Sequence, residues 1–256
     1  MKIVSWNVNS VRARLNNIAE FINEENPDIL LMQELKCVNE VFPQEFFEEL
    51  GYSVAVHGQK SFNGVAIAAK GNIEDVVRGI PDYRDDAARY IEASVDGVRV
   101  CNLYMPNGNP IGTPKFDYKL EFMQAFNKYA KQLRQNYRNS PLILGGDLNV
   151  APSKLDVFSE DAFAQDAVFQ VETQTEFKEL LSLGYVDVFR KLNPNSQEYS
   201  YWGYMGGEFR KNQGCRIDFI MFPEENLAQV KSCHIAKEVR AKPTASDHAP
   251  MILEFI

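Results

Sequence analysis

Long apolar runs are absent from this chain of 256 residues. No stretch approaches the length of about 20 apolar residues that spans a bilayer, and the first apolar run, which begins at Met1, is too short for a signal peptide. We therefore expect a cytoplasmic protein with no membrane partner. Fixed-period repeats, low-complexity tracts and Pro- or Ser-rich linkers are also absent, which favours a single domain over residues 1–256.

Cysteine and histidine are scarce. The four cysteines form no Cys-x-x-Cys pair and lie mostly in apolar surroundings, which indicates reduced core thiols rather than disulfides or a zinc site. His248, the last of three histidines, follows Asp247 and precedes an apolar run typical of a strand. An imidazole beside a carboxylate at such a place needs an explanation.

Basic residues are fewer than acidic ones, which gives a formal net charge of −8 at pH 7. A protein of this charge repels the phosphate backbone of nucleic acids at long range, which argues against a generic polyanion binder. A nucleic-acid partner must therefore meet a local basic patch. A divalent metal held by carboxylates would neutralise part of the formal charge.

Short apolar or β-branched runs alternate with amphipathic stretches, a pattern typical of α/β proteins. Strands are expected at residues 2–6, 29–33, 52–57, 64–69, 98–105, 141–145, 199–202, 215–222, 230–236 and 250–255. Helices are expected at residues 11–26, before Pro27, and at 120–137, 43–50 and 175–183. So many strands exceed what one small open sheet holds. The sequence therefore predicts an α/β fold, a four-layer sandwich of two packed mixed sheets flanked by helices.

Acids and amides gather where these strands end. Each alone has a structural explanation, because Asp and Asn terminate strands, cap helices and bond their own backbone. Asp218 differs, because it interrupts the apolar run from Ile217 to Met221, and a carboxylate is seldom buried without a partner. The partner that the sequence favours is His248, whose other ring nitrogen would then face a substrate.

Such a collection of groups suits metal-assisted phosphoryl chemistry. That reaction requires groups that neutralise charge on non-bridging oxygens, activate a water and stabilise the departing oxygen. Glu34 and Asp247 offer hard oxygen ligands, which Mg²⁺ or Mn²⁺ prefers. A purely structural role for His248 is the competing interpretation.

Six ordered segments carry a resemblance: "SWNVNSVRAR", "PDILLMQE", "NLYMPNG", "ILGGDLN", "SYWGYM" with "CRIDF", and "SDHAP". Together they span nearly the whole chain and closely resemble the exonuclease III family of apurinic/apyrimidinic (AP) endonucleases, within the endonuclease/exonuclease/phosphatase fold. The stretch "HGQKSFNGVAI" is similar to bacterial members. The resemblance implies a monomeric, metal-dependent DNA phosphodiesterase of base excision repair, working on double-stranded DNA in the bacterial cytoplasm and nucleoid. It would cleave 5′ to abasic sites, trim damaged 3′ ends, or both.

The same resemblance implies a metal site and a set of catalytic residues. Glu34 and Asp247 would bind Mg²⁺, with Mn²⁺ as a substitute, and Asn9 would lie beside them. The residues implied in catalysis are Asn7, Tyr104, Asp147, Asn149, Asp218 and His248. Asp147 with Asn149 would activate the water. Tyr104 and His248 would contact the scissile phosphate, with His248 oriented by Asp218, although His248 as the base remains an alternative.

A local basic surface is needed for DNA. Its candidates are Arg12, Arg14, Lys60, Arg89, Lys115, Lys119, Arg210, Lys211 and Arg216, against an interpretation as ordinary surface charge. The resemblance also implies that Asn107 lies near the DNA backbone and that Trp202 faces the pocket for a base-less sugar. A core position for Trp202 is the alternative, because a Trp beside strand residues is usually buried.

The chain departs from the family pattern at three positions. Cys215 stands where many members have a bulky apolar residue against the abasic pocket, Val168 stands in place of a small residue, and Asn9 replaces an Asp of some members. The balance between abasic-site incision and 3′-end processing is therefore open. Two alternatives also remain: a phosphoesterase of the same fold acting on a phospholipid or inositol phosphate, and a non-catalytic DNA-binding relative.

Overall fold

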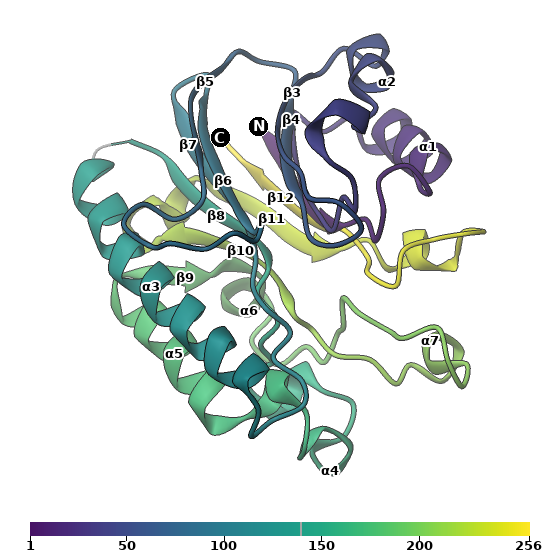
Figure 1. Ribbon diagram of the computed structural model, residues 1–256, viewed down its shortest axis with the longest axis vertical. Coiled ribbons are helices and arrows are strands. Elements are labelled where there is room, and N and C mark those ends of the chain that lie inside the picture. Colours follow the sequence, from purple (N-terminus) through teal and green to yellow (C-terminus); the bar gives the residue numbers. More distant parts are fainter. Residues whose placement is uncertain (139) are drawn as a thin grey trace.

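A computed structural model describes residues 1–138 and 140–256 of the chain. Two sheets face each other across an apolar interior, and helices cover both outer faces (Figure 1). This is the predicted four-layer α/β sandwich. Among the described residues, no helix is long and apolar enough to cross a membrane.

The first sheet has the strand order β11-β12-β1-β2-β4-β3. Its strands are β1 (Lys2–Asn7), β2 (Ile29–Gln33), β3 (Ser53–His57), β4 (Val65–Ala69), β11 (Val230–Ile235) and β12 (Met251–Phe255). β1 and β2 are parallel, and the other neighbours are antiparallel. Because β1 pairs with β12, residues from both ends of the sequence lie side by side in the middle of this sheet.

The second sheet has the order β5-β6-β7-β8-β10-β9. Its strands are β5 (Ile73–Arg78), β6 (Tyr90–Val95), β7 (Val98–Tyr104), β8 (Leu142–Asp147), β9 (Tyr185–Asp187) and β10 (Asp218–Pro223). β7 and β8 are parallel, and the other neighbours are antiparallel. The two sheets therefore repeat one pairing pattern, in which a parallel central pair joined by a helix is flanked by two hairpins.

Three apolar layers hold the sandwich together. α1 (Leu15–Glu25) and α2 (Gln44–Glu49) pack on the outer face of the first sheet, and α3 (Pro114–Asn136) and α5 (Val171–Ser182) on that of the second (Figure 1). The third layer lies between the sheets. A Cβ on Gly145 of β8 would come within 2.6 Å of Leu31 Cδ1, so the sheets approach one another closely there.

Most predicted elements are present, with several corrections. The strand predicted at 199–202 is wrong: Tyr201 makes only isolated bridges to Cys215 and His248. β5 and β6 were not predicted, because acidic residues interrupt their apolar pattern, and β9 is too short to give one. α3 begins earlier than expected, at Pro114, a residue suited to the first turn because it lacks an N–H. The other short elements are α4 (Glu160–Phe163), α6 (Val188–Leu192) and α7 (Glu208–Lys211).

The strand directions bring polar residues to one edge of the sandwich. Asn7 ends β1, Tyr104 ends β7 and Asp147 ends β8, and parallel pairing puts the ends of neighbouring strands together. Asp218 begins β10 directly opposite Asp147. His248 lies just before β12, which runs antiparallel to β1.

Candidate active site

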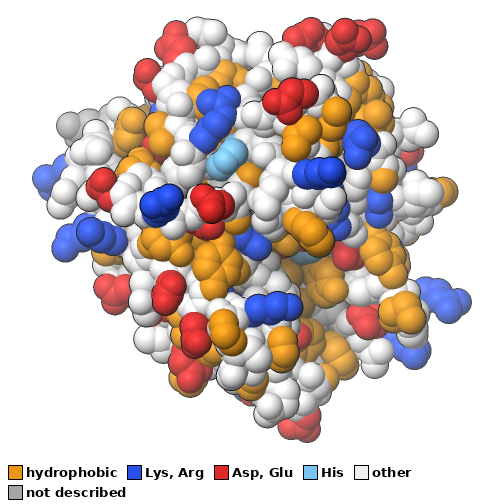
Figure 2. Space-filling view, viewed as in Figure 1, with side chains coloured by type: hydrophobic (Ala, Val, Ile, Leu, Met, Phe, Trp, Pro, Cys, Tyr) orange, Lys and Arg blue, Asp and Glu red, His pale blue; other side chains and the backbone are white. Residues whose placement is uncertain are grey.

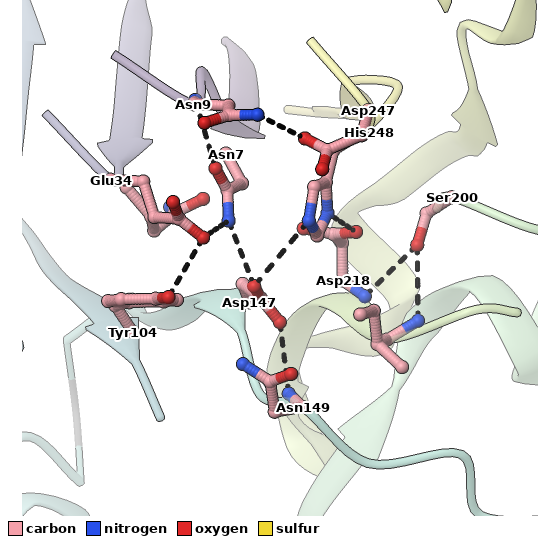
Figure 3. A network of polar contacts seen from close by, with 12 residues as sticks. Asn7, Asn9, Glu34, Tyr104, Asp147, Asn149, Ser200, Asp218, Asp247 and His248 are labelled. Carbon is pink, nitrogen blue, oxygen red and sulfur yellow. Dashed lines mark hydrogen bonds and ion pairs between the residues drawn. The ribbon is translucent and has the colours of Figure 1, made fainter. Parts of the chain in front are cut away.

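A cavity of about 240 Å³ lies at this edge. Its polar side is formed by Glu34, Tyr104, Asp147, Asn149, Asp247 and His248. Its less polar side is formed by Phe163, Val168, Tyr201, Cys215 and Ile217. The fold thus gathers most of the predicted site residues around one small space, and Figure 3 shows how their polar atoms face one another.

His248 is held by the backbone as well as by its ring. Its carbonyl accepts a hydrogen bond from Trp6 Nε1 at 3.2 Å, and its amide donates to Ser246 Oγ at 3.2 Å. The ring donates from Nδ1 to Asp218 Oδ2 at 2.8 Å, and Nε2 lies 3.8 Å from Asp147 Oδ2 (Figure 3). The pairing of Asp218 with His248 that the sequence predicts is confirmed.

Asp218 is fully buried, so its charge must be stabilised by its hydrogen-bond partners rather than by water. Ser200 Oγ accepts the backbone N–H of Asp218 and that of Ile217, both at 3.1 Å, and so anchors the start of β10. Oδ2 is taken by His248, whereas Oδ1 has no hydrogen-bond partner among the described residues. A buried carboxylate with so few donors favours a positively charged neighbour.

Asp147 and Asn149 form a tight turn after β8. The Asn149 amide donates to Asp147 Oδ1 at 3.0 Å, and Asn149 has a φ of 47°, in the left-handed region that Asn tolerates. Asn149 Nδ2 donates to the carbonyl of Met105 at 2.9 Å. These bonds fix both side chains of the Gly-Asp-Leu-Asn segment, which the sequence alone could not orient.

Asn7 connects the two carboxylates of the site. Its Nδ2 donates to Glu34 Oε1 and to Asp147 Oδ2, each at 3.0 Å (Figure 3). Tyr104 donates its hydroxyl to the same Glu34 oxygen at 2.8 Å. The second Glu34 oxygen lies 2.9 Å from Lys36 Nζ. Glu34 is therefore held on both oxygens.

Asn9 and Asp247 form the outer part of the site. Asn9 Nδ2 donates to Asp247 Oδ1 at 2.9 Å, and its amide N–H donates to Asn7 Oδ1 at 3.0 Å. Glu34, Asp247 and the amide oxygen of Asn9 are hard oxygen donors, which is the set that Mg²⁺ and Mn²⁺ prefer. The chemistry of these residues fits the predicted metal.

A second group of potential ligands lies deeper. Asp147, Asp218 and His248 place one ligand-type atom each within 4.8 Å of one another. His248 is a poor ligand in this arrangement, because Nδ1 is committed to Asp218 and a protonated ring has no free lone pair. We therefore favour the outer oxygen donors around Glu34 as the metal site.

The pKa values of His248, Asp147 and Glu34 are shifted in ways that suit different roles. Burial lowers the pKa of His248, but the neighbouring carboxylates, Asp218 first, outweigh it and raise that pKa to about 10. Burial raises the pKa of Asp147 to about 7, against the opposing effect of His248. Burial also raises the pKa of Glu34, but Asn7 and Lys36 outweigh it, so that the net pKa is lowered. At neutral pH, His248 is thus a cation and Glu34 an anion.

Of the predicted DNA-contact residues, only Asn107 lines the cavity in the described part of the chain. Asn107 is exposed and donates from Nδ2 to Asn149 Oδ1 at 3.4 Å, and Lys115 and Arg210 are exposed. Arg89 is half-buried, with its guanidinium carbon 4.8 Å from the centre of the Tyr104 ring. Trp202 is a correction, because it is fully buried in the core and its ring packs on Phe209 rather than on the cavity.

Two further basic residues are also placed differently from the sequence prediction. Arg216 is fully buried and pairs with Asp156 at 2.7 Å and Asp187 at 2.8 Å. Lys119 is fully buried beneath the cavity, where its ammonium donates to the carbonyls of Asn107 and Asn149. Neither belongs to the basic surface. Burial lowers the pKa of Lys119 to about 7.

Sequence reasoning did not single out several residues that the fold brings to the site. Lys36 contacts Glu34, Ser200 anchors the start of β10, and Ser246 donates to the carbonyl of Asn7 at 2.6 Å. Lys36 had no sequence signal, because β2 ends at Gln33 and the positive φ of Glu34 and Lys36 removes the alternation of an extended strand. The two serines had none, since serine is common in loops of any kind.

Comparisons with known proteins agree with this geometry. The sequence pattern of the Endonuclease/Exonuclease/phosphatase family matches residues 4–248. Exodeoxyribonuclease III of Haemophilus influenzae is 33% identical, over 100% of this chain and 100% of that protein. Exodeoxyribonuclease of Bacillus subtilis is 32% identical, over 99% of this chain and 98% of that protein.

Solved structures give the same result. A structure of an AP endonuclease from Archaeoglobus fulgidus has a TM-score of 0.96 at 36% identity, and the match covers 100% of this chain and 99% of that one. The fold and the family expected from the sequence are confirmed: this chain belongs to the endonuclease/exonuclease/phosphatase family.

Proposed function

We propose that the protein is a metal-dependent phosphodiesterase that acts on DNA in base excision repair. The observation that carries this proposal is the arrangement of His248 between Asp218 and Asp147, beside Glu34, in one small cavity. It supplies a cation for a phosphate, a base for water and an oxygen-rich site for a divalent metal. These are the groups that phosphodiester hydrolysis requires.

Asp147 is the base in this proposal. Its carboxylate accepts a proton from the attacking water, whose oxygen forms a bond to phosphorus while the bond to the departing oxygen breaks. Asn7 and the backbone amide of Asn149 hold the carboxylate in place. His248 is unsuited to the role, because a ring with a pKa of about 10 is already protonated at neutral pH. This favours Asp147 over His248 as the base.

His248 and Asn149 bind the phosphate. The protonated ring of His248 donates to a non-bridging oxygen from Nε2, and Asp218 keeps the ring oriented and charged. Asn149 also lines the cavity and can donate to the same group once DNA displaces its present contacts. Tyr104 also lines the cavity, where its hydroxyl donates to Glu34.

Glu34, Asp247 and Asn9 would hold the metal, for which Mg²⁺ is the expected ion and Mn²⁺ a substitute. A divalent ion bound there would neutralise charge on the phosphate and its departing oxygen. The remaining work falls to the side chains of the chain itself, which bind the phosphate, orient the water and take up its proton.

Relatives support DNA as the substrate. Besides the exodeoxyribonucleases, a 3′ phosphatase NExo from Neisseria, bound to product DNA hairpin, shares the fold with a TM-score of 0.96 at 34% identity, over 100% of this chain and 99% of that one. In Figure 2, Lys and Arg side chains lie among Asp and Glu side chains around the hollowed part of the visible face, so DNA could meet basic side chains there despite the net charge. Such an enzyme would work in the cytoplasm, as a monomer.

The less polar wall bears on which DNA ends or lesions are accepted. Val168 is 3% exposed and Cys215 is 1% exposed, and both line the cavity. The cavity of about 240 Å³ is smaller than the 300–1,000 Å³ of typical ligand pockets. We propose that this wall favours 3′-end trimming over incision at an extrahelical abasic sugar.

The test offers the purified protein two labelled duplexes, one with a single abasic analogue and one with a blocked recessed 3′ end. Each is incubated with Mg²⁺ and with chelator. His248→Asn is the loss-of-function variant, and His234→Asn is its matched control, because His234 is exposed on β11.

We expect 3′-end processing that requires metal, is lost in His248→Asn and is kept in His234→Asn. Incision at the abasic analogue as fast as 3′ processing would contradict the proposed restriction by the cavity wall. Absence of metal-dependent cleavage of both duplexes would reject DNA as the substrate and direct attention to other phosphoesters.

A further inference from the structure

Lys36 lies among the oxygens that we assign to the metal. Its Nζ is 2.9 Å from Glu34 Oε2 and also contacts Asn9 Oδ1. The side chain of Lys36 is 32% exposed and that of Glu34 is 18% exposed. The ammonium is therefore close to solvent but fixed against two of the three proposed ligands.

The backbone after β2 fixes this contact. Glu34 and Lys36 each have a φ of 55°, in the left-handed region that costs a non-glycine residue of the order of 1–3 kcal/mol. Two hydrogen bonds to the turn between β3 and β4 maintain the shape, from Leu35 N to Gly64 O at 3.2 Å and from Lys36 N to Asn63 O at 2.9 Å. In this turn the side chains of Glu34 and Lys36 meet, with Lys36 Nζ 2.9 Å from Glu34 Oε2.

The remaining lone pairs of Glu34 are limited. Oε1 already accepts hydrogen bonds from Asn7 and Tyr104, so Oε2 is the carboxylate oxygen with the most freedom for a cation. Asn9 presents its amide oxygen toward Lys36 because its Nδ2 is bonded to Asp247. A divalent ion at this site and the Lys36 ammonium thus draw on the same two oxygens.

We propose that Lys36 is a positioning residue that competes with the divalent metal for Glu34 Oε2 and Asn9 Oδ1, and so keeps the metal affinity of the free protein low. This inference rests on the metal site of the proposed function. A phosphate that enters the cavity adds negative charge, which attracts both cations and allows the ammonium to turn from Glu34 to the phosphate. The metal and DNA are then taken up together.

The test measures metal affinity without catalysis. Mn²⁺ is titrated into the DNA-free protein, and free Mn²⁺ is followed by its electron paramagnetic resonance signal. The variants are Lys36→Met and Lys36→Gln, which remove the charge, and Lys36→Arg, which keeps it. Lys128→Met is the matched control, because Lys128 is exposed on α3.

We expect Lys36→Met and Lys36→Gln to bind Mn²⁺ at least about tenfold more tightly than the wild type, because a unit charge a few Å from a divalent ion is removed. Lys36→Arg and Lys128→Met should stay within about twofold, since neither removes a charge next to the site. Addition of a duplex oligonucleotide should tighten Mn²⁺ binding more in the wild type than in Lys36→Met.

Unchanged or weaker Mn²⁺ binding by both neutral variants would overturn the inference. Failure of the proposed metal site gives a different result. In that case wild type and Glu34→Gln would bind Mn²⁺ equally, whereas a functioning site loses affinity in Glu34→Gln whatever the role of Lys36.

Discussion

Nδ1 of His248 lies 2.8 Å from Oδ2 of Asp218, and the carboxylate of this pair is fully buried. The pair joins the segment before β12, in one sheet, to the first residue of β10, in the other. A side chain contributed by each sheet is therefore needed to orient one imidazole, which makes the pair a sensitive place to test the proposed chemistry.

Asp218→Asn should lower kcat by about 100-fold or more, because the imidazole loses the group that keeps it charged and oriented. The rate is measured in single-turnover experiments on the 3′-blocked duplex. His248→Asn and the double variant are measured in the same way, which gives a double-mutant cycle for the two residues. Since the two residues act as a unit, the double variant should be little worse than the poorer single one. Fully multiplicative losses would indicate separate roles.

The pH dependence follows from Asp147 and His248. Asp147 must be ionised to accept a proton, and its raised pKa of about 7 means that it becomes neutral as pH falls through that value. We expect kcat/KM to fall about tenfold per pH unit below about pH 7, and to fall again toward pH 10 as His248 loses its proton. The two groups interact, so the apparent values belong to the pair. A profile that is flat from acid to neutral pH would contradict the role of Asp147.

Val168→Ala should raise the rate at the abasic analogue relative to the 3′-blocked duplex. Val168 lines the cavity, and its amide donates to Asp166 at 3.0 Å, a contact that alanine retains. Shortening the side chain thus enlarges the cavity without breaking this backbone bond. The readout is the ratio of kcat/KM on the two duplexes. Val171→Ala, at an exposed residue of α5, is the control. An unchanged ratio in Val168→Ala would exclude the wall as the selective element.

Asp156→Asn should lower the free energy of unfolding by about 3–5 kcal/mol, because it leaves the buried guanidinium of Arg216 without one of its two carboxylates. Urea titrations followed by circular dichroism measure this change. Loss of less than about 1 kcal/mol would mean that Asp187 alone satisfies Arg216.

The same variant changes how stability depends on pH. Burial raises the pKa of Asp156, but Arg216, Ser153 and Arg190 outweigh it, so the net pKa is lowered. A lowered pKa in the folded state gives stability that is present above the unfolded value of about 4 and is lost as pH falls through the folded value. Wild type should therefore lose more stability than Asp156→Asn between pH 5 and pH 2.

The strands and most of the site could be predicted because their signals are local. β1, β2 and β8 are apolar runs that end in Asn7, Gln33 and Asp147, and such runs followed by polar residues are visible in the sequence. The pairing of Asp218 with His248 was also predictable, because a carboxylate inside an apolar run needs a partner and few imidazoles were available.

Other features depend on tertiary contacts that leave no local signal. Glu92 breaks the pattern of β6, yet it is buried because Arg99 on β7 pairs with it. Lys119 and Arg216 look like surface charges in the sequence, but each is buried where polar atoms of distant segments meet it. Trp202 is drawn into the core by Phe209 and Tyr199 rather than facing the cavity.

The pairing of β1 with β12 has a consequence for synthesis. Lys2 pairs with Glu254, so the centre of the first sheet closes only after a segment that is made long after β1 has left the ribosome. His248 arrives with the same segment, after every other residue assigned to the chemistry. A nascent chain that has not yet reached β12 therefore carries the acids and amides without the imidazole, so the proposed chemistry has to wait until the first sheet closes.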